Sequence, residues 1–128
     1  MEQGRARVLV VDDDDMLRRM TALVLRRHGI PVEEASDGQH AIDRMREEGF
    51  EVLVLDLMMP RVNGWQVVAW LRTNMSAKPR IVVVLTAATK EVLNELDPDV
   101  VNTILFKPFD IHELAGYVRA CVQGVDLS

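Results

Sequence analysis

The sequence predicts an α/β domain built on one five-stranded parallel sheet, doubly wound with helices on both faces. Short apolar runs alternate along the chain with amphipathic segments of helical period, which is typical of this class. The runs at 52–55 and 81–85 contain no alternating polar residues, as expected for central strands covered on both faces. Several runs end in polar residues, at the strand ends where such sheets bind ligands.

We expect strands at about 7–11, 31–35, 51–55, 80–85 and 102–106. Four helical segments between and after them carry an apolar stripe that we expect to be buried. Their members are Met16, Met20, Leu23 and Val24 before Gly29; Ala41, Ile42 and Met45 before Gly49; Val67, Val68 and Leu71 after Gly64; and Ile111, Leu114, Val118 and Cys121. A short helix at 91–96 is a weaker prediction because Asp97 precedes Pro98, and a residue before proline disfavours the α region.

Length and composition limit the classes of protein to which this chain can belong. At 128 residues there is room for one domain with one core, spanning 1–128. No apolar stretch approaches the roughly 20 residues that span a membrane, and the first residues have no signal-peptide core, so we expect a cytoplasmic protein. The net charge of -5 without a basic cluster argues against nucleic-acid binding. The single cysteine, Cys121, is expected to be a buried thiol.

Four consecutive aspartates follow the first strand, and Asp56 ends the third. Asp14 or Asp15 can serve as the N-cap of the next helix, but one cap does not account for all four, and adjacent carboxylates repel. An EF-hand is excluded because Leu17 stands where that loop needs glycine. Mg²⁺ would relieve the repulsion, with Asp13 and Asp56 as direct ligands and Asp12 acting through water.

Thr86 and Lys107 end the fourth and fifth apolar runs. Taken singly, Thr86 could cap a following segment, and Lys107 could be a solvated surface residue. Both nevertheless follow strands at the edge that carries the acids, where the lysine can pair with an anion and the threonine can donate to one. The sequence therefore predicts a small pocket suited to phosphate and a divalent cation.

The remaining polar residues of interest are interpreted as structural. His28, His40 and His112 are too scattered in the sequence for a metal site and are expected on the surface. Asp110, with Glu113 three residues later, has the pattern of an N-cap for the last helix.

Four motifs, in this order and at these separations, resemble the receiver domain of two-component response regulators. They are Val8–Asp13, Asp56–Pro60 with Gly64, Thr86-Ala87 and Lys107-Pro108-Phe109. The resemblance covers nearly the whole chain. It implies a flavodoxin-like fold and a signalling module that catalyses only its own phosphorylation and dephosphorylation.

The resemblance also implies partners and residue roles. A sensor histidine kinase or a phosphotransfer protein would donate a phosphoryl group from phosphohistidine, and an unknown protein would be the downstream target. No organic cofactor is implied. By position, Asp56 would accept the phosphoryl group; Mg²⁺ would be bound by Asp12, Asp13, Asp56 and the backbone carbonyl of Met58; Thr86 and Lys107 would hold phosphoryl oxygens; and Ala87 would leave room.

Two departures from the family pattern concern how a signal leaves the domain. Ile104 stands where the family usually has Tyr or Phe, and 97–101 lacks the usual Gly-Ala turn. Because isoleucine is stiff at χ1 and has no hydroxyl, we expect coupling through backbone movement between Ala88 and Val101. Met58 and Ala88 offer no carboxylate or amide to orient a hydrolytic water, so we expect a long-lived aspartyl phosphate.

Two alternative functions fit part of the pattern. A haloacid dehalogenase-like phosphatase would use Asp12 as nucleophile and Asp14 as acid-base, but it needs a further acidic motif after Lys107 and leaves Asp56 without a role. A receiver-like adaptor that is not phosphorylated would not need the chemical residues that are all present. A further expectation is a cis Lys107-Pro108 peptide bond.

Overall fold

A computed structural model describes residues 7–59, 62–87 and 94–123 and contains one parallel sheet of five strands in the order β2-β1-β3-β4-β5. The strands are β1 (Val8–Val11), β2 (Val32–Ala35), β3 (Val52–Asp56), β4 (Ile81–Thr86) and β5 (Thr103–Phe106). The helices are α1 (Asp15–Arg27), α2 (Gly38–Glu47), α3 (Gly64–Thr73) and α4 (Ile111–Val122), with a 3-10 turn η1 (Met75–Ala77). The predicted fold class is confirmed, and the strand bounds shift by about one residue.

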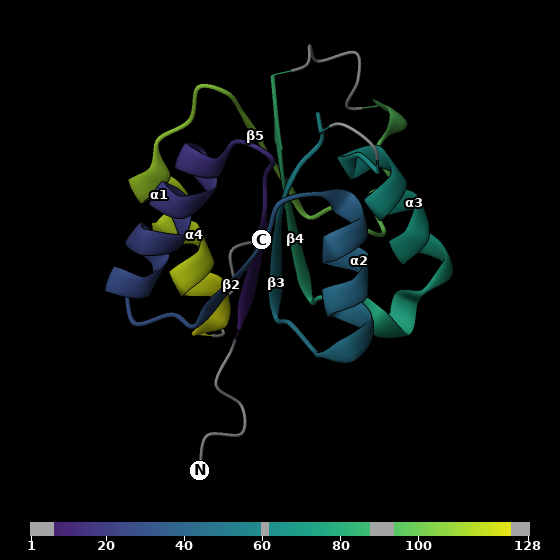
Figure 1. The fold of residues 1–128 in the computed structure, drawn as a ribbon, viewed down its shortest axis with the longest axis horizontal. Helices are drawn as coiled ribbons and strands as arrows, with labels where there is room; N and C mark the ends of the chain where they lie inside the picture. The colour runs from purple at the N-terminus through teal and green to yellow at the C-terminus, as the bar shows by residue number, and fades with distance from the viewer. Residues whose placement is uncertain (1–6, 60–61, 88–93, 124–128) are drawn as a thin grey trace.

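Each face of the sheet is covered by a pair of helices. Figure 1 shows α1 and α4 on one face and α2 and α3 on the other. Side chains alternate across a strand, so β1 sends Val8 and Val10 to the α1/α4 side, and Leu9 and Val11 to the α2/α3 side. The two apolar layers hold the sheet between them.

Short polar side chains fix where the helices begin. Asp14 caps α1 by accepting the Leu17 N–H at 3.1 Å, and Asp110 caps α4 by accepting the His112 N–H at 2.8 Å. Both caps were expected from the sequence. Gly29, after α1, has φ of 79°, a left-handed conformation that favours glycine, and it ends that helix as predicted.

The predicted buried face of α1 is wrong for three of its four residues, while the fourth, Val24, is partly buried against the core. Met16 is 73% exposed, and Met20 and Leu23 are each 49% exposed. The residues buried against the sheet are instead Arg18, Thr21, Ala22 and Leu25. Both sets have helical spacing, but an arginine is rarely buried unless it has partners, so apolar periodicity alone does not indicate the set that contains Arg18. The predicted faces of α2 and α3 are confirmed, as are Leu114, Val118 and Cys121 on α4.

Three further expectations have different outcomes. The Lys107-Pro108 bond is cis, as expected. The first half of the predicted helix at 91–96 lies outside the described residues, as does Ala88. No helix in the described parts of the chain is both long and apolar enough to cross a membrane.

Candidate phosphoacceptor and metal site

The carboxyl edge of the sheet brings together polar residues from four strands. β1 and β3 pair in register up to the residues before Asp12 and Asp56, which places these two carboxylates side by side. Thr86 is the last residue of β4, and the Lys107 N–H, directly after β5, donates to the Thr86 carbonyl at 2.8 Å. The predicted convergence of these residues on one edge is confirmed.

Three carboxylates and one ammonium form the centre of the site. Asp12, Asp13 and Asp56 each offer an oxygen within 4.8 Å of the others. The Lys107 Nζ lies 3.3 Å from Asp56 Oδ2 and 4.0 Å from Asp12 Oδ2. Lys107 therefore lies against two of the three acids, and these four described groups carry an excess of negative charge.

The acids differ in their exposure to solvent. Asp12 and Asp56 are buried, with 1% and 2% of their surface exposed, whereas Asp13 is exposed to solvent. Burial raises the pKa of Asp12 to about 6, and the charge of Asp56 adds to this rise, while the Asp14 N–H and the charge of Lys107 oppose it. A divalent cation would relieve the same electrostatic cost.

Backbone N–H groups orient the two buried carboxylates. The Asp14 N–H donates to Asp12 Oδ1 at 3.0 Å, and the Met58 N–H donates to Asp56 Oδ1 at 3.1 Å. In each case the donor lies two residues after the acid, so a local turn holds the side chain in place. The opposite oxygen of each acid is the one nearest to Lys107.

Gly64, the first residue of α3, packs directly against the loop that follows Asp56. Its N–H donates to the Leu57 carbonyl at 3.0 Å, and the Leu57 N–H donates to the Leu85 carbonyl at 3.0 Å. A Cβ at position 64 would stand 2.5 Å from the Asp56 carbonyl oxygen and 2.5 Å from the Leu57 Cα. Glycine is needed here because the helix approaches the β3 backbone so closely.

The donor set fits Mg²⁺. Three carboxylate oxygens are hard ligands, and Mg²⁺ usually retains several waters beside one or two carboxylates and phosphate oxygens. The Lys107 ammonium, next to Asp56, can pair with a further anion brought to that carboxylate. Chemically, the arrangement can place a nucleophilic carboxylate between a cation site and an ammonium, as phosphoryl transfer requires.

The sequence interpretation missed one residue at this site, Arg18. Its side chain is buried under the β1–α1 loop, where Nη1 donates to the Asp12 carbonyl oxygen at 3.0 Å. A charged residue at helical spacing from Ala22 and Leu25 was the signal that could have revealed it.

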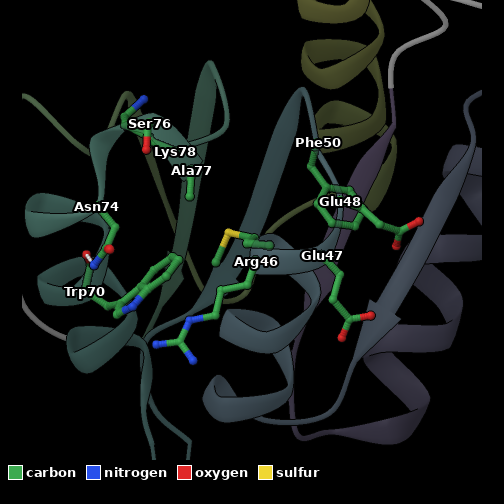
Figure 2. A pocket seen from close by; sticks show the side chains of 11 residues that line it. Arg46, Glu47, Glu48, Phe50, Trp70, Asn74, Ser76, Ala77 and Lys78 are labelled. Atoms are coloured by element: carbon green, nitrogen blue, oxygen red, sulfur yellow. Dashed lines mark hydrogen bonds between the residues drawn. The ribbon is translucent and has the colours of Figure 1, made fainter.

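A separate cavity of about 510 Å³ lies at the opposite edge of the sheet, beside the ends of α2 and α3. Figure 2 shows its lining, in which the Arg46 guanidinium lies 5.6 Å from the centre of the Trp70 ring. None of the residues of the acidic edge lines this cavity, so it is not part of the site.

Comparison with known proteins identifies the family. The model of the response regulator receiver domain matches residues 8–119. The DNA-binding response regulator MtrA of Mycobacterium tuberculosis is 37% identical over 126 residues, which are 98% of this chain and 54% of MtrA. The response regulator MprA of Mycobacterium avium is 36% identical over 117 residues, covering 91% of this chain and 51% of MprA. The chain spans about half the length of the curated relatives it matches.

Solved receiver structures share the fold. The receiver domain of the Francisella response regulator 1452 is 28% identical, with a TM-score of 0.83 over 93% of this chain and 98% of that one. The chemotaxis protein CheY4 of Vibrio cholerae is 29% identical, with a TM-score of 0.80 over 91% of this chain and 98% of that one. With the family model matching most of its length, this chain belongs to the response regulator receiver domains.

Proposed function

We propose that Asp56 is the phosphoacceptor of this receiver domain and that residues 1–128 form a single phosphorylation module. The observation that carries the proposal is the convergence of Asp12, Asp13 and Lys107 on Asp56 at the carboxyl edge of the sheet. Receiver domains bind Mg²⁺ at such an acidic pocket. Here Asp12, Asp13, Asp56 and the Met58 backbone carbonyl would hold the ion, which would neutralise phosphoryl charge when bound.

The transfer itself requires little covalent chemistry from the protein. A carboxylate oxygen of Asp56 forms a bond to phosphorus while the N–P bond of a phosphohistidine breaks, and the departing imidazole takes up a proton from solvent. Lys107, 3.3 Å from Asp56 Oδ2, pairs with the incoming phosphoryl oxygens. Thr86, at the end of the neighbouring strand, donates its hydroxyl to another. Positioning and charge neutralisation supply most of the rate.

The donor would be a sensor histidine kinase or a phosphotransfer protein, and the receiver of the signal a second protein, with the system in the cytoplasm. Exposed apolar side chains near the site support a protein partner, because Met16 follows the acidic loop and Met58 follows Asp56 by two residues. Exposed methionines adapt their shape to a partner surface. The domain would catalyse its own phosphorylation and dephosphorylation and no other reaction.

The phosphatase alternative is not favoured by the geometry, because it gives no role to Asp56, the residue that Lys107 approaches most closely among the described acids. The adaptor alternative leaves the buried charge of Asp12 and Asp56 without a use.

The proposal is tested by incubating the protein with acetyl phosphate and Mg²⁺, followed by intact mass measurement and peptide mapping. We expect one added phosphoryl group on Asp56. Asp56→Asn should remain unlabelled, whereas Asp43→Asn, which changes an exposed carboxylate on α2, should be labelled like the native protein. Labelling of Asp56→Asn at the native level would refute the assignment.

A further inference from the structure

Among the described residues, Arg18 is the only cationic residue that is buried. Removing a guanidinium from water is costly unless its donors find acceptors, and removing one partner of a buried charge pair usually destabilises a protein. Arg18 lies in the first turns of α1, directly beneath the loop that carries Asp12 and Asp13. The burial of a cation at this place therefore indicates a structural role for Arg18 in the acidic loop.

The guanidinium joins three separate parts of the chain. Nη1 donates to the Asp12 carbonyl oxygen at 3.0 Å and to Asp15 Oδ1 at 2.7 Å, and Nε donates to Glu34 Oε1 at 3.1 Å. These acceptors belong to the β1–α1 loop, the first turn of α1 and strand β2. The planar fork of arginine suits such a divergent set of acceptors, which lysine cannot reproduce.

The contact with Asp12 completes the anchoring of that residue. The Asp12 N–H donates to the Ala35 carbonyl oxygen at 3.2 Å, the Asp12 carboxylate accepts the Asp14 N–H, and the Asp12 carbonyl oxygen accepts Arg18. Both peptide groups and the side chain of Asp12 are therefore held. The adjacent Asp13 shares the peptide bond whose oxygen Arg18 binds.

We propose that Arg18 is a positioning residue for the metal site, holding the Asp12–Asp13 peptide so that both carboxylates face Asp56 before a cation binds. This inference rests on the proposed function of the acidic edge. The three carboxylates repel one another, and the β1–α1 loop can reduce that repulsion by moving outward. A fixed peptide prevents this movement, so less binding free energy is spent on ordering the loop.

Arg18 keeps its charge in this position. Burial by itself lowers the pKa of Arg18, but hydrogen bonds with Asp15 and Glu34 outweigh that effect, and the pKa is raised. The guanidinium therefore also places a permanent positive charge behind the acidic loop.

Arg26 provides a matched control. It lies on the same helix and contacts the same Glu34, through Oε2 at 3.4 Å, but its side chain is half exposed and it binds the Val32 carbonyl oxygen instead of the acidic loop. Arg26→Gln therefore removes a comparable cation from the same network and leaves Asp12 untouched.

The test measures the Mg²⁺ dissociation constant by calorimetry for the native protein, Arg18→Gln, Arg18→Lys and Arg26→Gln. We expect Arg18→Gln to weaken Mg²⁺ binding about tenfold, as is usual when a group supporting a metal ligand is lost, with partial recovery in Arg18→Lys. Arg26→Gln should stay within about twofold of the native value, since it makes no contact with the acidic loop. Equal affinity in Arg18→Gln and Arg26→Gln would overturn the inference.

A second readout separates positioning from general loss of stability. The rate of Asp56 labelling by acetyl phosphate is measured against Mg²⁺ concentration. We expect Arg18→Gln to raise the half-saturating Mg²⁺ concentration by a similar factor and to change the saturated rate much less. A lower saturated rate at unchanged half-saturation would contradict the inference.

If Arg18→Gln does not fold, Arg18→Lys replaces it, because lysine keeps the positive charge but lacks the planar fork that reaches the Asp12 carbonyl, Asp15 and Glu34 together. Mg²⁺ binding weakened beyond that of Arg26→Gln supports the inference, and equal binding overturns it. Failure of the native protein to bind Mg²⁺ or to be labelled at Asp56 would instead refute the proposed function, so the two failures are distinguishable.

Discussion

Replacement of Gly64 by alanine should destabilise the protein and displace the backbone next to Asp56. The added Cβ would stand 2.5 Å from two backbone atoms, the Asp56 carbonyl oxygen and the Leu57 Cα, whereas ordinary contacts begin at 3.4 Å. The methyl group is thus about 0.9 Å too close to atoms that cannot rotate away. Either the start of α3 or the loop after Asp56 must move.

The size of the effect follows from the two groups that would be displaced. Overpacking of this kind costs roughly 1–3 kcal/mol. Movement of α3 also weakens the hydrogen bond from the Gly64 N–H to the Leu57 carbonyl, worth about 1 kcal/mol. We expect a loss of about 2–4 kcal/mol in the free energy of unfolding, out of a typical total of about 5–15 kcal/mol. In a domain of this size that lowers the melting temperature by about 10 °C.

Urea denaturation at constant pH, with and without Mg²⁺, measures this loss. Gly116→Ala is the matched control, because a Cβ there meets nothing within 4 Å and the residue lies within α4. That control should be neutral or more stable by up to about 1 kcal/mol, since alanine favours helix more than glycine. Gly64→Ala should also bind Mg²⁺ more weakly, as the Asp56 backbone shifts. A difference of less than about 0.5 kcal/mol between the two variants would refute the steric argument.

Three further predictions concern the acidic edge. Mg²⁺ at one hundred times its dissociation constant should stabilise the native protein by about 2.7 kcal/mol. In a thermal melt, Asp13→Ala should lose this response, while its metal-free form should be no less stable than the native protein because one repelling carboxylate is gone. An unchanged Mg²⁺ response in this variant would reject the site. Without metal, the pKa of Asp12 is about 6 in the folded protein against 3.8 for an ordinary aspartate, so between these pH values the folded protein binds more protons than the unfolded protein. The contribution of Asp12 to stability therefore falls as pH rises from about 4 to about 6. Asp12→Asn should remove that slope from urea midpoints measured in chelator, and an identical slope would contradict the assignment. Met58→Asn should shorten the lifetime of phosphorylated Asp56 severalfold by orienting a water, whereas an unchanged lifetime would show that water access is set elsewhere.

The sequence by itself determined the sheet and the composition of its reactive edge. Uninterrupted apolar runs are a local property of the chain, and in a parallel sheet all carboxyl ends lie at one edge. Asp12, Asp56, Thr86 and Lys107 each follow or end such a run, so their convergence followed from the strand assignment without knowledge of side-chain packing. The caps of α1 and α4 were predictable for the same reason, because a cap depends on residues within one turn.

Only the tertiary structure decided which face of α1 is buried. Periodicity shows that a stripe exists, but Met16 and Met20 form one such stripe and Arg18 and Ala22 lie on another. The choice depends on acceptors that the sequence does not place near Arg18, namely the Asp12 carbonyl on the loop and the Glu34 carboxylate on β2. Burial of a charge is favourable only where distant parts of the chain supply its partners, and those partners exist only after the chain has folded.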